Sequence, residues 1–432
     1  MEENKKVLNI VYDDWDKETD IPYANCLRYY NNGWHFWMGE GLPDHWINHQ
    51  WVDPIKHPNK YIINKCKLND VVESPNQNYY YVIGHAHSSI TDMFRVKPPL
   101  SQEIIGYLKN YKNFFVMFRT EHESDNETSF VALLNFINQQ SINPKQIYVV
   151  NNNDKLDEYK KKHNTDVNVH KTEFLASSST IVLNNLENSK FNPTKEGKFF
   201  MCFNKTPKRH RLSLLLLLKK NNLLNDINWS FVPDYSTIFT NDFFERIIDS
   251  DNLKYLTNEI DYFNKLKIKV SDYEEDKGWF SEGKPPNLEG LPHYMRSVPE
   301  FSFNYENSYV NITTESMYDD LDNVIHITEK SFKPFYHYQF PIILATQGHV
   351  KMMKEKYGFD FFDDVIDHSY DDEPNQKNRL IKFVTEIIRL TNRKKEMIEF
   401  YKNNQERFEN NKKIVMKNLE SDSDFLFFMN LI

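Results

Sequence analysis

Short apolar runs alternate with longer amphipathic stretches along the first 170 residues. The runs have strand length, are rich in β-branched and aromatic residues, and end in polar residues, which predicts buried strands. The stretches between them have helical spacing, as at Val131, Leu134 and Ile137. Strands are predicted at residues 7–12, 79–83, 114–118 and 147–150, and helices at residues 102–109, 130–140 and 155–162. Strands that alternate with helices indicate a parallel sheet with crossover connections.

The same alternation begins again after residues 191–197, a polar segment with Pro and Gly that is typical of a linker. Strands are predicted at residues 199–203, 309–313 and 341–345, and helices at residues 212–218, 349–357 and 377–411, the last as one or two helices. Gly358 is expected to end the second of these helices. Five prolines between residues 230 and 300 predict an insertion or long loops there.

The expected fold class is therefore α/β, with two Rossmann-like parallel-sheet domains. The first covers residues 1–190, the linker residues 191–197, and the second residues 198–432. Ligands of open parallel sheets bind outside the carboxyl ends of the strands, so we expect a ligand in a cleft between the two domains.

The composition narrows the classes of function. Only 11 of the 432 residues are glycine and no G-x-G-x-x-G is present, which excludes the usual dinucleotide fingerprint. The segment from Gly278 to Lys284 has phosphate-loop spacing, but two prolines follow it and block the helix that must come next. A formal net charge of -9 argues against general nucleic-acid binding. The aromatic content of 15% is attributed to A/T-rich codons.

Targeting and redox signals point to a reducing cytoplasm, or a host's cytoplasm if the chain is viral. A strand-like segment begins within the first dozen residues, where a signal peptide would need an apolar core. The longest apolar run, residues 214–218, is far below the ~20 residues of a spanning helix. Cys26, Cys66 and Cys202 are scattered without metal-ligand spacing. We expect no membrane span, no metal and no bound cofactor.

One segment of the second half combines several features of a binding site. Glu315 follows a predicted buried strand, and fourteen residues later Glu329 stands between Thr328 and Lys330 at a predicted helix start. Thr328 is a good N-cap, and the free N–H groups of a helix N-terminus favour anions. Lys330 and Lys333 add positive charge for a diphosphate. A neighbouring carboxylate suits the hydroxyls of a ribose or a sugar ring.

This pattern resembles the α-1,3-fucosyltransferases, which carry Phe-Glu-Asn-Ser at a strand end, then Thr-Glu-Lys, a helix and a hydrophobic strand ending in Gly. It is more similar to the fucosyltransferase-like glycosyltransferases of viral and algal genomes. These share Thr-Glu-Lys-x-Phe-Lys-Pro, residues 328–334 here, and Gly-Phe-x-x-Phe, residues 358–362. The resemblance covers roughly residues 198–390. It implies the GT-B fold, with two Rossmann-like domains facing a central cleft, the nucleotide-sugar mainly on the second, and a C-terminal helix that can cross back.

The chain departs from the family in the spacing of its glutamates. The family places its first Glu about ten residues before the second, whereas Glu315 and Glu329 are fourteen apart. Glu306, in Tyr-Glu-Asn-Ser, is literally closer to the family motif but lies 23 residues before Glu329. Glu315 is preferred because it ends the clearer strand, and Glu306 remains the alternative. Pro334 predicts that the helix starting at Thr328 is short or kinked.

A basic loop at residues 203–212 separates a predicted strand from a Leu-rich helix. In the resembled family an Asn and a later Arg in this loop hold the donor's phosphates, which implies Asn204 and Arg211. Arg209 is a close competitor for the second position. The planar guanidinium of Arg can bind a phosphate bidentately. A solvated basic turn is the alternative reading of the same residues.

We expect an inverting reaction. Retaining GT-B enzymes often carry two glutamates eight positions apart, and Glu306, Glu315 and Glu329 lack such a partner. An inverting transferase needs a base that deprotonates the acceptor hydroxyl as it attacks the anomeric carbon. The candidates follow predicted strands of the first domain: Glu121, His122 and Glu123 foremost, then Asp13, Asp14, Asp16, His85 and His87.

The sequence thus predicts a metal-independent, inverting glycosyltransferase that uses a nucleotide-diphosphate sugar. Resemblance alone favours GDP-fucose or another GDP-sugar, with a glycan or other hydroxyl-bearing acceptor. Asn204, Arg211 and Lys330 would neutralise the diphosphate, and Glu315 and Glu329 would hold ribose and sugar hydroxyls. The alternatives are a transferase that acts on hydroxylated DNA bases and a non-catalytic nucleotide-sugar or glycan-binding protein.

Overall fold

The computed structural model describes residues 6–11, 61–85, 100–120, 126–151, 153–171, 190–204, 208–230, 240–270, 302–318 and 324–419. The chain divides into two compact units. The described residues up to Lys171 form unit 1 together with Val324–His326 and Leu419, and those from Lys190 to Asn418 otherwise form unit 2. Both units are α/β and each contains one parallel sheet, which confirms the fold class predicted from the alternating pattern.

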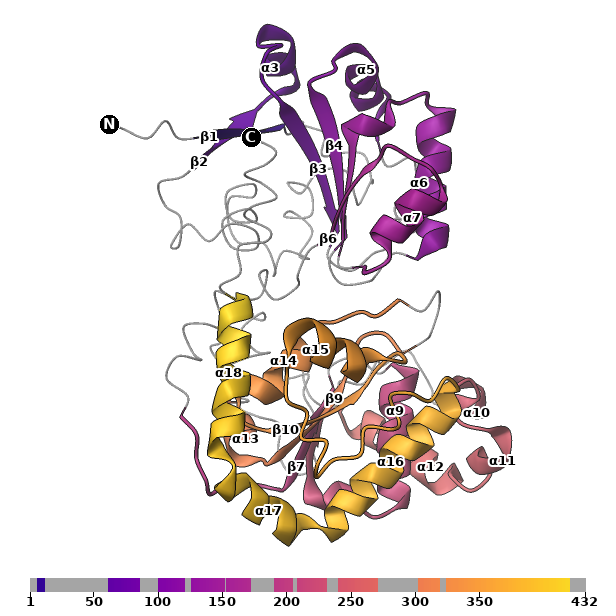
Figure 1. The fold of residues 1–432 in the computed structure, drawn as a ribbon. Helices are drawn as coiled ribbons and strands as arrows, with labels where there is room; N and C mark the ends of the chain where they lie inside the picture. The colour runs from indigo at the N-terminus through magenta and orange to yellow at the C-terminus, as the bar shows by residue number, and fades with distance from the viewer. Residues whose placement is uncertain are drawn as a thin grey trace. The chain divides into compact units, whose positions relative to one another are not determined.

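Unit 1 is built on a six-stranded sheet in the order β2-β1-β3-β4-β5-β6, whose neighbouring strands are all parallel. The strands are β1 (Lys6–Val11), β2 (Tyr61–Cys66), β3 (Tyr79–His85), β4 (Phe114–Thr120), β5 (Ile147–Asn151) and β6 (Asn168–Lys171). The helices are α3 (Leu68–Glu73), α5 (Gln102–Asn110), α6 (Glu127–Gln139) and α7 (Leu156–Lys162). Helices α6 and α7 lie side by side (Figure 1), and Lys162 donates to Glu127 at 2.7 Å between them.

The apolar runs predicted as strands form the centre of this sheet. Phe114, Val116 and Phe118 of β4 are fully buried and pack in one cluster with the inner faces of α5 and α6. The sequence pattern did not predict β2 or β6. Strand β6 lies at the edge of the sheet and all four of its residues are half-buried, so it carries little of the hydrophobic signature of a core strand.

Unit 2 is built on a four-stranded parallel sheet in the order β10-β9-β7-β8. The strands are β7 (Phe200–Phe203), β8 (Ile227–Ser230), β9 (Val310–Thr314) and β10 (Phe340–Leu344). Val310 of β9 is paired with Phe200 of β7 on one side and with Phe340 of β10 on the other, so these three adjacent strands start together. We call the residues that follow these strands the carboxyl edge and those that precede them the amino edge.

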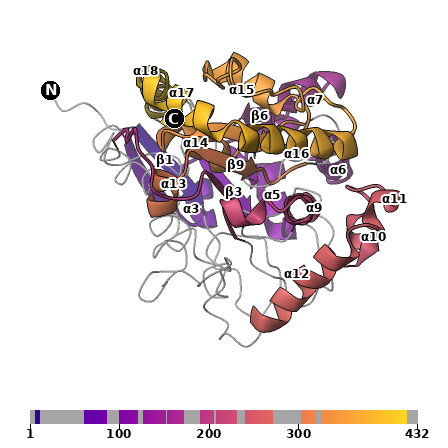
Figure 2. The same cartoon turned by 90° about the horizontal axis from the view of Figure 1, so that it is seen from below.

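The helices of unit 2 are α9 (Arg209–Lys220), α10 (Asn241–Phe244), α11 (Ser250–Leu253), α12 (Thr257–Val270), α13 (Ser302–Asn307), α14 (Glu329–Tyr336), α15 (His349–Tyr357), α16 (Gln376–Asn392), α17 (Lys394–Asn403) and α18 (Gln405–Leu419). The last three follow one another around the unit, and α16 lies across it (Figures 1 and 2). None of the described helices combines the length and the apolar character that a membrane crossing requires.

Two predictions for unit 2 were wrong. Residues 377–411 were expected to form one or two helices, but breaks at Arg393 and Asn404 divide the stretch among α16, α17 and α18. Residues 230–300 were expected to be irregular, but residues 241–270 contain α10, α11 and α12. None of the five prolines falls within residues 241–270, so nothing there prevents helices. Residues 271–301 lie outside the described part of the chain.

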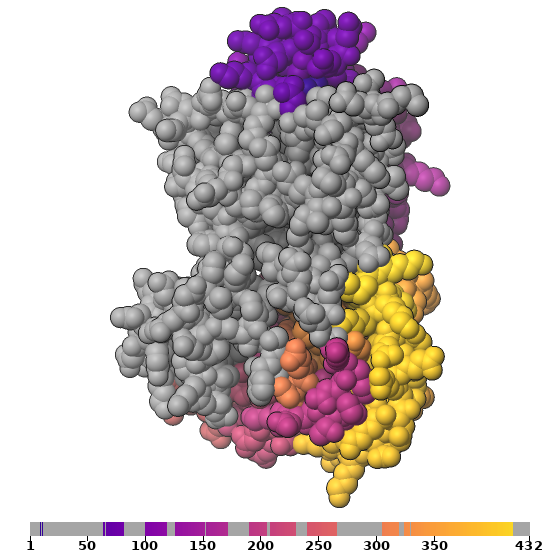
Figure 3. Space-filling view, turned by 90° about the vertical axis from the view of Figure 1, so that its left-hand side faces the viewer, coloured from indigo at the N-terminus to yellow at the C-terminus, as the bar shows by residue number. Residues whose placement is uncertain are grey.

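Residues 191–197, predicted as a linker, pack against unit 2. Phe191 stacks on Tyr401 of α17 with ring centroids 4.8 Å apart. The backbone N–H of Lys195 donates to the hydroxyl of Tyr309 at 3.0 Å, and that of Gly197 donates to the carbonyl of Asn307 at 3.0 Å. In Figure 3 this magenta segment lies against the yellow C-terminal helices. Aromatic and backbone contacts therefore hold a segment whose composition is polar.

The close approach at Gly197 predicts opposite effects of two Gly→Ala substitutions. A Cβ at position 197 would lie 2.6 Å from the carbonyl oxygen of Asn307, so Gly197→Ala is expected to lower the free energy of unfolding. Overpacking of this kind costs about 1–3 kcal/mol. Gly106, in α5, has open space around the same position, so Gly106→Ala should stabilise by about 0.5–1 kcal/mol. Urea unfolding measures both, and equal effects would contradict the close approach.

Candidate functional site

Glu315 directly follows β9 at the carboxyl edge, and its side chain is fully buried. Its carboxylate accepts hydrogen bonds from the backbone N–H of Thr328 at 3.0 Å and from the hydroxyl of Thr328 at 2.7 Å. The hydroxyl of Ser331 and the backbone N–H of Ser316 also donate to it. A buried carboxylate is tolerated when such donors surround it. Glu315 therefore ties the end of β9 to the first turn of α14.

Helix α14 begins where the sequence predicted. Thr328 is its N-cap and its hydroxyl accepts from the backbone N–H of Lys330 at 3.3 Å. The ammonium of Lys330 also donates to that hydroxyl, at 3.2 Å, so this half-buried side chain turns back over the helix start. The helix is eight residues long and includes Pro334, as expected for a short helix. Glu329 is its first residue, and its side chain lies outside the described atoms.

A histidine that the sequence analysis did not single out extends this cluster to α15. The Nε2 atom of His349 lies 2.8 Å from the hydroxyl of Ser331, which itself donates to Glu315. Because a serine hydroxyl has one proton to give, this geometry assigns the Nε2 proton to His349 as the donor toward Ser331. Burial lowers the pKa of His349, and the charges of Glu315 and Asp371 only partly oppose the shift. The imidazole is therefore neutral at neutral pH.

The first turn of α9 is fixed to the same edge. The guanidinium of Arg211, only 4% exposed, donates to the carbonyls of Thr314 and Glu315 at 3.4 and 3.2 Å. His210 lies 2.9 Å from the carbonyl of Glu315 through Nε2. Lys208 donates to the carbonyl of Ser316 at 3.0 Å. The basic loop predicted from the sequence thus meets the end of β9 through backbone carbonyls, a contact that the sequence does not reveal.

Asn204 completes this arrangement from β7. Its side chain is 1% exposed and accepts a hydrogen bond from the hydroxyl of Thr314. The carboxyl edge therefore brings together Asn204, Arg211, Glu315, Thr328 and Lys330 of the predicted donor site.

Two other predicted residues lie apart from these. Arg209 is exposed, and its guanidinium stands 5.7 Å from the ring of Phe243 in α10. The ammonium of Lys333 stands 5.9 Å from the ring of Tyr305 in α13, the helix that precedes β9 at the amino edge. Between the two arginines of the loop, the structure places Arg211 and not Arg209 beside Glu315.

A second buried arginine lies at the same edge and was not predicted. Arg379 of α16 is 1% exposed and donates to the carbonyl of Ala345, directly after β10, at 3.0 Å. Its guanidinium stands 5.4 Å from the ring of Tyr318, which in turn stacks on His210. The sequence hid this residue because it lies in a long charged helix, where an arginine is ordinarily solvent-facing.

The candidate bases of unit 1 lie outside the described residues, except for the backbone of His85. Glu121, His122 and Glu123 follow β4, and Asp13, Asp14, Asp16 and His87 are likewise outside the described part. The last residues of β3 and β4, His85 and Thr120, are paired in register, so these strands end together at one edge. Among the described residues, no three His, Cys, Asp or Glu side chains cluster in a way that could hold a metal ion.

Comparisons with known proteins give only a distant likeness. No family model and no curated protein matches the chain. Among solved structures it is similar to an α,α-trehalose-phosphate synthase (UDP-forming) from Burkholderia vietnamiensis, with 11% identity and a TM-score of 0.33. The match covers 82% of this chain and 66% of the other, just under two thirds of its length. A likeness this distant carries no argument about donor, acceptor or mechanism.

The buried position of Glu315 predicts that it matters more for stability than Glu306. Glu315→Gln places an amide N–H₂ among hydroxyl and N–H donors, and each lost bond to a charged acceptor costs about 1.5–3 kcal/mol. We expect Glu315→Gln to lower the free energy of unfolding by about 2–4 kcal/mol. Glu306→Gln changes an exposed side chain and should stay within about 0.5 kcal/mol of wild type. Urea unfolding of the two variants tests this, and equal stability would refute the tie to α14.

Proposed function

We propose that the chain is a glycosyltransferase whose nucleotide-sugar donor binds with its diphosphate at the carboxyl edge of the unit 2 sheet. The observation that carries the proposal is the convergence of two helix starts on the end of β9. The first turn of α9 brings Lys208 and Arg211 there, and the first turn of α14 brings Lys330. Ligands of open α/β sheets bind outside the carboxyl ends of the strands, and helix N-termini favour anions.

The cationic side chains differ in how they can act on a diphosphate. Lys208 and Lys330 are half-buried and have flexible stems, so they are the groups proposed to contact the phosphates. Arg211 is buried against two carbonyls and is proposed to act mainly through the field of its charge. Fixed cations of this kind stabilise a leaving diphosphate without reorganisation at the moment of reaction.

Glu315 takes a different role from the one expected for it. Its carboxylate is fully buried and already accepts from Thr328 and Ser331, so it is poorly placed to hold a ribose or sugar hydroxyl. We assign it to positioning: it holds the start of α14, and therefore Lys330, at the edge of the sheet. Glu329 stands next to Lys330 at the first position of the helix and remains the proposed contact to donor hydroxyls.

The proposed reaction is an inverting transfer. The acceptor hydroxyl attacks the anomeric carbon, the bond from that carbon to the diphosphate oxygen breaks, and the nucleoside diphosphate leaves. The hydroxyl proton goes to a base that we assign to the segment after β4, with Glu121 first among Glu121, His122 and Glu123. A GDP-sugar such as GDP-fucose is the preferred donor because of the resemblance of residues 328–334, and a glycan is the preferred acceptor.

Donor binding predicts a nucleotide-dependent gain in stability that requires Lys330. A thermal-shift panel of GDP, UDP, dTDP and CMP with their sugars should contain one nucleotide that stabilises the full chain. At a concentration of about 100 times its Kd the gain is about 2.7 kcal/mol. Lys330→Met should lose most of it because the ammonium beside the α14 start is gone.

The matched control is Lys402→Met, which removes an exposed lysine of α17 and should keep the full shift. If no nucleotide stabilises the wild-type chain, or if Lys330→Met responds as wild type does, the donor site is not at this edge. Stabilisation by a nucleotide-sugar without turnover toward any acceptor would instead favour a non-catalytic binding protein.

The base assignment predicts that a substitution at Glu121 lowers the transfer rate without weakening nucleotide binding. Glu121→Gln should lower the transfer rate by about 10²–10⁴, because a general base contributes that much, while nucleotide binding stays at the wild-type level. Glu123→Gln and His122→Asn are the matched comparisons within the same segment. Rates are followed by the release of nucleoside diphosphate. Unimpaired transfer in all three variants would place the base elsewhere.

A further inference from the structure

A pocket of about 200 Å³ lies at the amino edge of the unit 2 sheet. Its lining comes from segments that precede three strands. These residues are Lys190, Asn192 and Lys195 before β7, Glu306 and Asn307 before β9, and His337 and Tyr338 before β10. The strands are four or five residues long, so roughly 15 Å of sheet separates this pocket from the carboxyl edge. The pocket is therefore distinct from the donor site proposed above.

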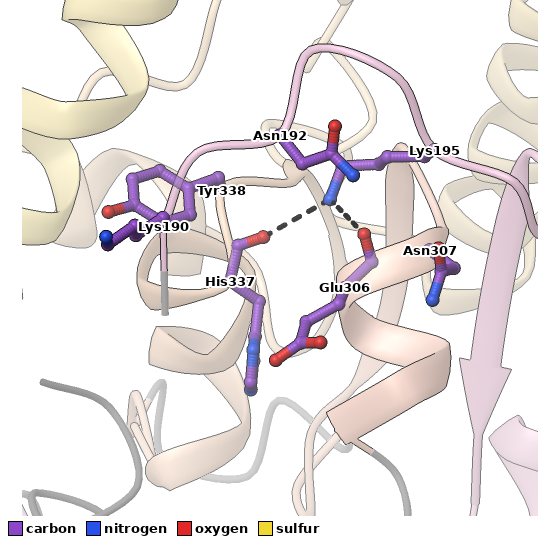
Figure 4. A pocket seen from close by; sticks show the side chains of 7 residues that line it. All are labelled: Lys190, Asn192, Lys195, Glu306, Asn307, His337 and Tyr338. Carbon is purple, nitrogen blue, oxygen red and sulfur yellow. Dashed lines mark hydrogen bonds between the residues drawn. The ribbon is translucent and has the colours of Figure 1, made fainter. Parts of the chain in front are cut away.

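The centre of the pocket is the buried lysine Lys195, whose side chain is only 7% exposed. Its ammonium donates to the carbonyl of Glu306 at 2.9 Å and to that of His337 at 3.5 Å, as the dashed lines in Figure 4 show. These carbonyls stand at the ends of α13 and α14, where a cation is favourable. An ammonium has three N–H donors, and the two carbonyls use two of them. The centroid of the Tyr401 ring lies 5.5 Å from the nitrogen.

Positive charge dominates around this ammonium. Lys190 lines the pocket. Burial lowers the pKa of His337, and the charges of Lys195, Lys333 and Lys412 lower it further. The carboxylates that face the group are Glu306, which lines the pocket, and Glu409, which acts on the neighbouring Tyr338. Among the residues that the structure describes, four lysines thus stand against two glutamates.

Neutral polar groups lie in the same wall. Nδ1 of His337 is buried and has no hydrogen-bond partner among the described residues. Asn192 and Asn307 add side-chain amides to the lining (Figure 4). Side-chain amides and the third proton of the Lys195 ammonium are groups that can donate to a bound oxyanion.

We propose that this amino-edge pocket is a second ligand site, which binds a small oxyanion of the phosphate class, either free phosphate or the phosphate group of an ester. The anion accepts from the ammonium of Lys195 and from the side-chain amides of the wall, and Lys190 stands at the same pocket. The inference does not depend on the proposed glycosyltransferase activity, because no residue of the carboxyl edge takes part in it.

Binding at this site is coupled to a proton. Burial lowers the pKa of Lys195 to about 7, with the charge of Glu306 partly opposing the shift. A bound anion favours the ammonium and raises that pKa again, so binding near neutral pH takes up a proton. Affinity is therefore highest below pH 7 and falls as the pH rises above 7, where the unliganded amine becomes neutral.

Isothermal titration calorimetry of the full chain tests the proposal, with inorganic phosphate and with sulfate as probes. Sulfate keeps its charge over this range, so its pH dependence reports the protein alone. We expect sulfate to bind at least tenfold more weakly at pH 8.5 than at pH 6.5. Proton uptake is measured at pH 7.5 in two buffers of different ionisation enthalpy.

The variants give effects of different sign. Lys195→Met should weaken anion binding at least tenfold, whereas Glu306→Gln removes a facing negative charge and should bind as wild type does or a few-fold more tightly. Lys402→Met, outside the pocket, should bind like wild type. If Lys195→Met does not fold, Lys190→Met and Lys412→Met should each weaken binding a few-fold.

No binding of either anion by the wild-type chain would overturn the proposal, and so would full affinity in Lys195→Met. Loss of binding in Lys330→Met would also overturn it, because the anion would then belong to the carboxyl edge. A parallel titration with glucose 6-phosphate distinguishes free phosphate from a phosphate ester as the ligand. Tighter binding than that of inorganic phosphate supports an ester, and equal binding supports free phosphate.

Discussion

The arrangement of unit 2 depends on one buried carboxylate. Glu315 directly follows β9 and binds the first turn of α14 through Thr328 and Ser331. The positive end of a helix is a favourable place for a negative charge, and the donors of that turn replace the water that the carboxylate lost on burial. Ser331 also meets His349, the first residue of α15. The same contacts therefore fix the positions of α14 and α15 relative to the sheet.

That constraint decides which charges can gather at the carboxyl edge. With α14 held in place, Lys330 lies at the end of β9, and the carbonyls around Glu315 receive Arg211, His210 and Lys208. Glu315 is the only carboxylate among these contacts, so positive charge exceeds negative charge there. The chain has too few glycines for a glycine-rich phosphate cradle, and side-chain cations with helix starts offer the alternative way to hold a phosphate.

The same sheet has a cationic pocket at its other end, and the two ends differ in chemistry. At the carboxyl edge the lysines are half-buried beside helix N-termini. At the amino edge Lys195 is buried beside helix C-termini, where carbonyls favour its charge and burial opposes it. The first end suits a permanently charged diphosphate, and the second suits an anion whose binding responds to pH.

Local features of the fold were predictable from the sequence, and the long-range contacts were not. The strand-length apolar runs, the N-cap Thr328 and the helix end at Gly358 depend on neighbouring residues, and they are observed where expected. The half-buried edge strand β6 and the burial of Arg379 depend on neighbours distant in sequence. Sequence also placed Glu315 at a strand end. It could not show that the hydroxyl of Ser331, sixteen residues later, donates a hydrogen bond to this buried carboxylate.

The most direct test of the account is a crystal structure of the full chain with the nucleoside diphosphate that stabilises it best. The account predicts the diphosphate at the carboxyl edge of the unit 2 sheet, within hydrogen-bond distance of the Lys330 ammonium, with Glu315 still bound to Thr328. A diphosphate bound anywhere else on the chain, or a Glu315 side chain turned out of its contacts to meet the ligand, would contradict it.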